Sequence, residues 1–428
     1  MENFRIESLE INKIGAFEHL KMDFPKKKDP EKAEIHVLTG ENGTGKSTVL
    51  EVLSQTGSTN MKISFLQKKV WDSTSLGKVY FSDNIKSVLD FDCIFNSHLL
   101  DKFPNKMLEY CNKTNKPENN IFDFILVAYS GHRSFRDSKI SGIDENLENP
   151  MSNALNFQDS INSKTVLQWL ANTKSKEYIS KGKGDFNKSS LYAQKITDIE
   201  KIISQIICNG NEDTVKIELE EDKFQIQLRI RNQYLSFDQL PDGVKSLFGW
   251  VADLVIRLHR LQWKDDLPIF DRNFILFLDE IEVHLHPAWQ RKILPVVQKL
   301  FKNAQIFIST HSPFVVGSVD GAWVHKFKKD GAYAVLDGEP ILSEDAESYD
   351  TILEEVFGIT RRFGDPIEDL LAEFRIITRE ILKGNESNID RWNEIISIFA
   401  KQERPDEIMS VIKPIRNQIN RIRNQVIA

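Results

Sequence analysis

Cysteine is scarce in this 428-residue sequence, which contains only Cys93, Cys111 and Cys208. An odd count without a Cys-x-x-Cys pair argues against both a disulfide framework and a cysteine zinc site. Long apolar runs are also lacking, since stretches such as residues 274–278 are far shorter than the ~20 residues that cross a bilayer. The first residues contain no apolar signal segment. These absences predict a cytoplasmic protein with no membrane association.

The sequence also lacks an excess of basic residues. It has 63 Asp and Glu against 56 Lys and Arg, a formal charge of −7, which argues against a surface that neutralises nucleic acid throughout. Residues 174–188 nevertheless carry five lysines against two acids. Contact with DNA through this local patch therefore stays possible. The length of the chain first suggests two to three domains.

The strongest motif is residues 40–47, Gly-Glu-Asn-Gly-Thr-Gly-Lys-Ser, a full match to the phosphate-binding loop pattern. It follows an apolar strand expected at 35–38 and precedes a helix expected at 47–54. Glycines let backbone N–H groups approach phosphates, whose charge the helix N-terminus favours. Lys46 can reach the β- and γ-phosphates, and the Ser47 hydroxyl can bind Mg²⁺. The predicted nucleotide contacts are Gly40, Glu41, Asn42, Gly43, Thr44, Gly45, Lys46, Ser47 and Thr48.

A second motif is the continuous apolar stretch 274–278, which is followed directly by Asp279 and Glu280. Continuous apolarity is typical of a strand covered on both faces. Such strands present polar residues at their carboxyl ends, where open α/β sheets bind ligands. Asp279 is predicted to hold Mg²⁺, and Glu280 to orient and polarise the attacking water. The pair favours nucleotide hydrolysis over binding alone.

A third apolar stretch, residues 305–309, ends at Thr310 and His311. A lone histidine at a strand end is usually a solvated turn residue. The order of phosphate loop, acidic strand and histidine strand is more specific, so His311 is predicted to sense the γ-phosphate and couple it to neighbouring loops. The predicted catalytic residues are therefore Lys46, Glu280 and His311.

Together these motifs resemble the ABC-type ATPases of the RecF/SMC/OLD branch. Residues 9–18 are similar to the strand pair that precedes the phosphate loop in that branch. Residues 279–290 resemble the acidic motif and following loop of bacterial defence ATPases, which implies that His284 and His286 lie near a dimer interface; a metal site there is the lesser alternative. Arg133 falls in an element that recurs in these ATPases and is expected to approach the nucleotide or the partner subunit.

The resemblance implies an α/β fold: an ABC-type P-loop ATPase head with a mixed sheet and flanking helices, split by an inserted lid, plus a C-terminal helical segment. Residues 1–56 are expected to form the N-terminal lobe of the core. Residues 213–342 are expected to form the C-terminal lobe, with the signature motif, the acidic strand and the histidine. Residues 57–212 would be the inserted region, with a core strand near 121–128, and residues 343–428 a helical region that docks a partner.

In that family, two subunits enclose two ATP molecules with Mg²⁺, and each nucleotide meets the signature motif of the other subunit. The candidate signature is residues 240–246, Leu-Pro-Asp-Gly-Val-Lys-Ser, at the start of a helix expected at 243–260. Asp242 and Gly243 are therefore expected to contact the partner's nucleotide. Pro241 stands where the family usually has a serine, which bears on how firmly ATP closes the dimer and how fast hydrolysis runs.

The resemblance is best to the stand-alone ATPase subunits of anti-phage systems of the Septu type. It implies a homodimer or higher oligomer that acts as the sensor or regulator of a separate nuclease. An HNH nuclease is the favoured type. A Toprim nuclease would need an Asp-x-Asp, and the 117 residues after His311 (428 − 311) contain none. The alternative is a RecF/SMC-like repair or recombination ATPase that binds DNA directly; the lack of a long coiled-coil arm favours the defence ATPase.

The C-terminal residues carry an apolar stripe with helical spacing. Its members are Ile412, Ile415, Ile419, Ile422 and Val426. A terminal helix that packs on its own domain explains this stripe, and a helix that docks a partner is the second interpretation.

Overall fold

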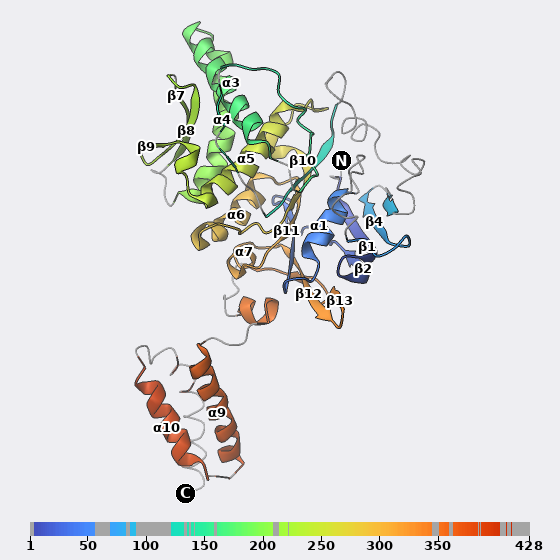
Figure 1. Cartoon of the computed structure of the whole chain (residues 1–428), viewed down its shortest axis with the longest axis vertical. Helices are drawn as coiled ribbons and strands as arrows, with labels where there is room; N and C mark the ends of the chain where they lie inside the picture. The colour runs from blue at the N-terminus through green and yellow to red at the C-terminus, as the bar shows by residue number, and fades with distance from the viewer. Residues whose placement is uncertain are drawn as a thin grey trace. The chain divides into compact units, whose positions relative to one another are not determined.

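Five strands of the main sheet run parallel and extend to one edge of it, and the sheet has seven strands in the described part of the chain (Figure 1). The strand order is β13, β12, β3, β11, β10 and β6, with β14 paired to β12. The parallel strands are β3 (Glu34–Gly40), β6 (Phe124–Tyr129), β10 (Asn273–Leu278), β11 (Gln305–Ser309) and β12 (Trp323–Asp330). Two further strands pair antiparallel to β12: β13 (Tyr333–Leu336) and β14 (Ile341–Leu342).

The computed structural model divides the chain into two units, Met1–Phe357 and Gly358–Ala428, and each is described by itself. Arg133, Ile415, Ile419, Ile422 and Val426 lie outside the described residues, as do Cys93 and Cys111. The described residues are 4–55, 69–82, 86–90, 121–131, 135–136, 138–140, 142–157, 161–208, 214–220, 222–344, 351–358, 363–383, 385, 387–402, 408 and 412.

Two smaller antiparallel sheets accompany the main sheet. The first has the order β2, β1, β4 and β5, and alternating burial along β1 places one face of this sheet on the core. Its strands are β1 (Ile6–Ile14), β2 (Phe17–Asp23), β4 (Leu76–Phe81) and β5 (Lys86–Asp90). The second sheet consists of β7 (Val215–Glu220), β8 (Gln225–Ile230) and β9 (Gln233–Leu235).

Helices of the first unit flank the main sheet (Figure 1). Helix α4 packs against α3, α5 and α6, so the segment between the two motif-bearing parts of the chain is joined to the core. None of the described helices has the length and apolarity to cross a membrane. The helices are α1 (Lys46–Gln55), α3 (Ser163–Gly182), α4 (Phe186–Ile207), α5 (Asp242–Arg260), α6 (Pro287–Leu300) and α7 (Pro313–Val316), with short turns η5 (Phe237–Gln239), η6 (Ile269–Asp271) and η7 (Ile352–Val356).

Strands β10 and β11 are buried along almost their whole length, as their continuous apolar sequences predict. Because β3, β6, β10 and β11 run parallel, their carboxyl ends share one edge of the sheet. The phosphate loop, the acidic pair and His311 all follow these strands directly. The expected α/β head with a mixed sheet, flanking helices and a C-terminal helical segment is confirmed.

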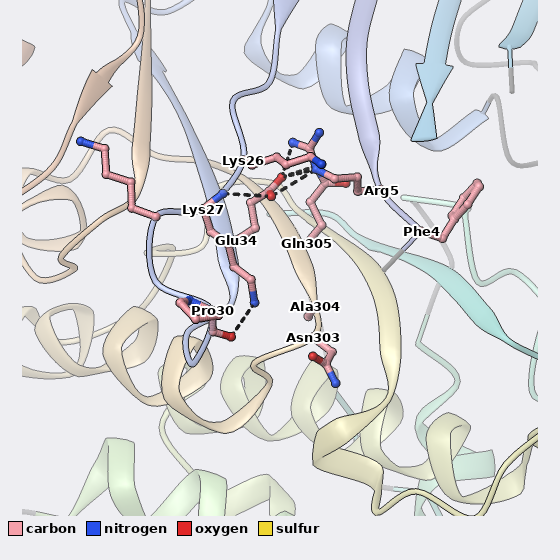
Figure 2. A pocket seen from close by; sticks show the side chains of 10 residues that line it. Phe4, Arg5, Lys26, Lys27, Pro30, Glu34, Asn303, Ala304 and Gln305 are labelled. Carbon is pink, nitrogen blue, oxygen red and sulfur yellow. Dashed lines mark hydrogen bonds and ion pairs between the residues drawn. The ribbon is translucent and has the colours of Figure 1, made fainter. Parts of the chain in front are cut away.

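A buried ion pair joins the opposite edge of the main sheet to the N-terminal strand (Figure 2). Arg5 donates to Glu34 over 2.7 Å, and Glu34 also accepts from Gln305 and lies 3.0 Å from the His36 ring. The Lys27 amine donates to three backbone carbonyls beside the same cavity of about 390 Å³. The cavity's charged groups thus tie β1, β3 and β11 together.

The second unit contains a pair of helices, α9 (Asp365–Leu382) and α10 (Ile389–Ala400), that pack against each other. Phe374 stacks on Trp392 with ring centroids 5.4 Å apart. Ile412 is fully buried in the same apolar cluster. The first residue of the C-terminal stripe therefore packs within its own unit.

Candidate nucleotide site

The phosphate loop after β3 has a backbone that glycine alone adopts readily. Gly40, Gly43 and Gly45 have φ angles of +142°, +81° and +85°. A Cβ at Gly40 would lie 2.3 Å from the carbonyl oxygen of Phe327, and one at Gly45 would lie 2.5 Å from the Phe17 ring. The glycines therefore allow the loop to pack tightly between β12 and the start of β2.

Lys46 begins α1 and turns its ammonium group back over the loop. Its Nζ donates to the carbonyl oxygens of Gly40 and Glu41, each over 2.9 Å. Burial lowers the pKa of Lys46, while the negative charges of Asp279 and Glu280 oppose that shift. A cation held at the mouth of a glycine-rich loop is suited to bind phosphate oxygens.

Ser47 and Asp279 meet although 232 positions separate them in the sequence. The Ser47 hydroxyl donates to Asp279 Oδ1 over 3.0 Å, and the Ser309 hydroxyl donates to the same oxygen. A hydroxyl and a carboxylate brought together from two elements are the oxygen ligands that Mg²⁺ prefers. Ser47 and Asp279 therefore fit the predicted binding of Mg²⁺. Ser309, at the end of β11, was not predicted from the sequence.

Glu280 leaves β10 in a left-handed backbone conformation, with φ of +44°. Its backbone N–H donates to the Ser309 hydroxyl over 2.8 Å. A Cβ at Gly131 would lie 2.7 Å from Glu280 Oε2, so the acidic side chain packs directly on bare backbone after β6. Gly131 stands in the same recurrent element as Arg133, but no sequence pattern indicated that Glu280 would pack on it.

His311 lies on the loop that follows β11. Its backbone N–H donates to Glu282 Oε1 over 2.6 Å. Burial lowers the pKa of the His311 ring, and the positive charge of Lys46 lowers it further, against the raising effect of Glu282. The neutral ring is therefore favoured at pH 7, and the structure brings His311 within the electrostatic reach of Lys46.

The candidate signature residues lie beside the loop that follows the acidic strand. Pro241 caps α5, and the Asp242 side chain, which is 78% exposed, pairs with Lys245 at 3.8 Å. A Cβ at Gly243 would lie 2.4 Å from the carbonyl oxygen of His284, so this position has room only for glycine. Contact of Asp242 and Gly243 with a partner's nucleotide stays a prediction.

The histidines after the acidic pair have separate roles in the structure. His284 has a left-handed backbone, with φ of +64°. His286 caps α6, because its Nδ1 accepts the N–H of Ala288 over 3.2 Å. Among the described residues, no three His, Cys, Asp or Glu side chains gather in a way that could hold a metal ion.

Two aromatic side chains that the sequence did not single out lie beside the phosphate loop. Trp71 and Tyr333 stack with ring centroids 5.3 Å apart and are 41% and 38% exposed. The Trp71 indole donates to the carbonyl oxygen of Gly15 over 3.0 Å. A Cβ at Gly15 would lie 2.8 Å from the Thr48 hydroxyl, so this turn packs on the first turn of α1. The pair thus contacts the turn at Gly15, which in turn packs on the helix that follows the phosphate loop.

The β12–β13 hairpin flanks the phosphate loop on the same side. Besides the close approach of Phe327 to Gly40, it places Lys329 over the loop. Lys329 Cε would lie 4.0 Å from a Cβ at Gly43, and Lys329 Nζ lies 3.9 Å from a carboxylate oxygen of Glu41. The hairpin therefore adds a second cation near the loop, which sequence analysis missed.

Two family models match the chain. One, described as "AAA domain, putative AbiEii toxin, Type IV TA system", matches residues 117–317, and one described as "AAA domain" matches residues 4–56. A solved structure titled as the SmcHead bound to the C-winged helix domain of ScpA has a TM-score of 0.42 and 12% identity, covering 80% of this chain and 98% of that chain.

Curated relatives match at low identity. The chain is 27% identical to the "Retron Ec83 probable ATPase" of Escherichia coli, over 56% of this chain and 42% of that protein, so it spans less than half of that relative. It is 24% identical to the "Retron Vc95 probable ATPase" of Vibrio cholerae, over 73% and 72% of the two lengths. It is 22% identical to the "Septu protein PtuA" of Bacillus thuringiensis, over 96% of both lengths.

A glycine-rich phosphate loop and a strand-borne acidic pair on one edge of a parallel sheet define a nucleotide-binding protein of the P-loop class. The matched models and relatives narrow the class. The chain is similar to ABC-type ATPases of the RecF/SMC/OLD branch, with Septu and retron ATPases among its relatives. The resemblance inferred from the motifs is thereby confirmed.

Proposed function

We propose that this chain binds and hydrolyses ATP and serves as the ATPase subunit of a bacterial anti-phage defence complex. The observation that supports hydrolysis best is the hydrogen bond of 3.0 Å between Ser47 and Asp279, which joins the phosphate loop to the acidic strand. Glu280 follows Asp279 directly and is held by Ser309 and Gly131. The site thus combines phosphate binding, metal ligands and a carboxylate placed for an attacking water.

The roles of the side chains follow from these positions. The phosphate loop and Lys46 bind the phosphates, and Ser47 and Asp279 would hold Mg²⁺. The metal, when bound, neutralises charge on the phosphate oxygens. Glu280 orients the attacking water and accepts its proton, since phosphoryl transfer depends on positioning more than on covalent chemistry. His311 lies on the adjacent loop and reports on the γ-phosphate.

We further assign the base of the nucleotide to the exposed face of the Trp71–Tyr333 pair. The pair is anchored through Gly15 to the first turn of α1, where Thr48 and its neighbours would hold the phosphates. Stacking of a nucleobase on an aromatic side chain contributes about 1–3 kcal/mol. This surface would therefore contribute to affinity for ATP beyond the contacts to phosphate.

ATP would be enclosed between two copies of the chain. The N-terminus of α5 carries partial positive charge and is exposed at Asp242, so its backbone N–H groups suit contact with the γ-phosphate of the nucleotide bound by a partner subunit. We therefore propose a homodimer or higher oligomer whose closure depends on ATP. Light scattering of the Glu280→Gln variant with and without Mg-ATP tests this, and an unchanged mass with ATP would contradict it.

The ATPase is proposed to control a separate nuclease, and an HNH nuclease is the favoured type. Support comes from the names of the relatives, which include a Septu protein and two retron ATPases. Co-expression with a candidate HNH nuclease, followed by purification of the complex and a DNA cleavage assay, tests the proposal. Nuclease activity that is the same with wild-type chain, with Glu280→Gln and without the chain would contradict it.

ATP hydrolysis is tested with the purified chain. Phosphate release should depend on Mg²⁺ and fall about 100-fold or more in Lys46→Ala and Glu280→Gln, because each removes an electrostatic or positioning group. Lys264→Ala is a matched control, since this lysine is exposed and pairs with Asp123 at 3.3 Å away from the site. Equal rates in all four proteins would exclude the proposed site.

The alternative function is that of a RecF/SMC-like ATPase that binds DNA directly. One observation favours it: Lys181, Lys183 and Lys188 are exposed around the turn between α3 and α4. Reversal of these three charges should weaken DNA binding and flatten its salt dependence. No DNA binding by the wild-type chain at low salt, with or without ATP, would remove this alternative.

A further inference from the structure

Glu282 lies two residues after the proposed catalytic glutamate and has no role in the mechanism above. It links the loop after β10 to the loop after β11, because its Oε1 accepts the backbone N–H of His311 over 2.6 Å. A short hydrogen bond to a charged acceptor is among the stronger ones in proteins. Three other hydrogen bonds join these segments within the described part of the chain, and each of them involves Ser309. Glu282 provides the hydrogen bond that reaches the backbone of His311 itself.

The second oxygen of Glu282 is buried and has no hydrogen-bond partner within the described part of the chain. A buried carboxylate oxygen without a partner destabilises the fold. A neutral acceptor would make the same bond to His311 without this cost. The use of glutamate therefore indicates that its negative charge also matters at this place.

The negative charge of Glu282 acts on two groups of the proposed site. It raises the pKa of Lys46 and that of the His311 ring, in each case against the lowering effect of burial. Glu282 therefore lies in the field of the phosphate-binding cation as well as at the histidine loop. It is the third acidic side chain around this cation, after Asp279 and Glu280.

We propose that Glu282 is a positioning residue for hydrolysis: its Oε1 fixes the backbone of His311 near Lys46. This inference rests on the proposed ATPase function. It assigns Glu282 no contact with the reacting atoms. The residue acts through the placement of His311, so its loss should slow turnover and leave ATP binding nearly intact.

The test compares Glu282→Ala and Glu282→Gln with wild type in steady-state ATP hydrolysis. Glu282→Ala should lower kcat about 100-fold, the effect of a displacement of about 1 Å at a catalytic group, with KM for ATP within about threefold of wild type. The Gln variant keeps an acceptor for the His311 N–H, so its kcat should be at least about tenfold higher than that of the Ala variant. Glu218→Ala is the matched control, since this glutamate lies on β7 and pairs with Arg229 at 3.3 Å.

The outcomes separate the two proposals. No hydrolysis by the wild type overturns the proposed function itself. Hydrolysis by the wild type with Glu282→Ala within about twofold of it overturns the role of Glu282 alone, as does a Gln variant no faster than the Ala variant. If Glu282→Ala does not fold, Glu282→Asp replaces it: the shorter side chain does not reach His311, so kcat should fall with KM unchanged, and an unchanged kcat overturns the inference.

Discussion

The Tyr129 hydroxyl donates a hydrogen bond of 2.7 Å to the Asp253 carboxylate in the core. Asp253 lies on α5, whose N-terminus carries the candidate signature residues, and it also accepts from Arg257 over 2.6 Å. The carbonyl oxygen of Tyr129 accepts the N–H of Asp279 over 2.9 Å. Tyr129 thus connects the signature helix with the acidic strand of the same chain.

Loss of the Tyr129 hydroxyl should destabilise the fold and weaken the connection between α5 and β10. Tyr129→Phe keeps the ring and leaves Asp253 paired with Arg257, so the chain should fold. The free energy of unfolding should fall by about 1–3 kcal/mol, because a buried acceptor loses a partner. Urea denaturation measures this, with Tyr234→Phe as the control, since Tyr234 is 61% exposed. An unchanged unfolding free energy in both variants would show that the bond contributes nothing.

A side chain at Gly131 should displace Glu280. A Cβ there would lie 2.8 Å from the Cβ of Glu280, which is closer than real Cβ atoms come. Gly131→Ala should therefore lower kcat for ATP about 100-fold by misplacing the carboxylate, with nucleotide binding preserved. Gly142→Ala is the matched control, because a Cβ there would meet nothing within 4 Å. Equal turnover in the two variants would contradict the proposed role of Glu280.

The sequence was sufficient to predict the residues that carry local motifs. The phosphate loop has a fixed spacing and stands between a strand and a helix, and the acidic pair follows a continuous apolar strand. Parallel strands then bring Asp279 to Ser47, so their meeting follows from topology alone. These are the parts of the site that short-range patterns encode.

The rest of the site depends on packing between distant segments, which no spacing encodes. Ser309 looks like an ordinary strand residue until β11 lies beside β10. Gly131 matters only because Glu280 packs on it. Trp71 and Tyr333 are 262 positions apart (333 − 71) and meet because β13 lies next to the turn at Gly15. Strands β12 and β13 were not predicted; the lysines of β12 obscure its alternation, and β13 has only four residues.

Removal of the aromatic pair should weaken ATP binding without changing the chemistry. Trp71→Ala should raise the KM for ATP in proportion to a loss of about 1–3 kcal/mol of stacking, with kcat little changed. Inhibition by tripolyphosphate, which has no base, should be the same in the variant and the wild type. Tyr234→Ala is the control for loss of an exposed aromatic residue. An equal loss of affinity for ATP and tripolyphosphate would show that Trp71 acts on the phosphate loop instead.

The pair formed by Arg5 and Glu34 predicts how stability changes with pH. Burial alone would raise the pKa of Glu34, but hydrogen bonds and charge from His36 and Arg5 outweigh burial and lower it from 4.5 to about 2. A carboxylate whose pKa is lower in the folded than in the unfolded chain stabilises the fold fully above pH 4.5, and that contribution is lost as the pH falls from 4.5 toward 2.

Glu34→Gln should cost about 3–5 kcal/mol at pH 7, because it leaves a buried guanidinium without its carboxylate, and should flatten the loss of stability below pH 4.5. Urea unfolding across this pH range measures both effects, with Glu218→Gln as the control, since the Glu218–Arg229 ion pair is partly accessible to solvent. Parallel pH curves for Glu34→Gln and the wild type would mean that another group causes the acid sensitivity.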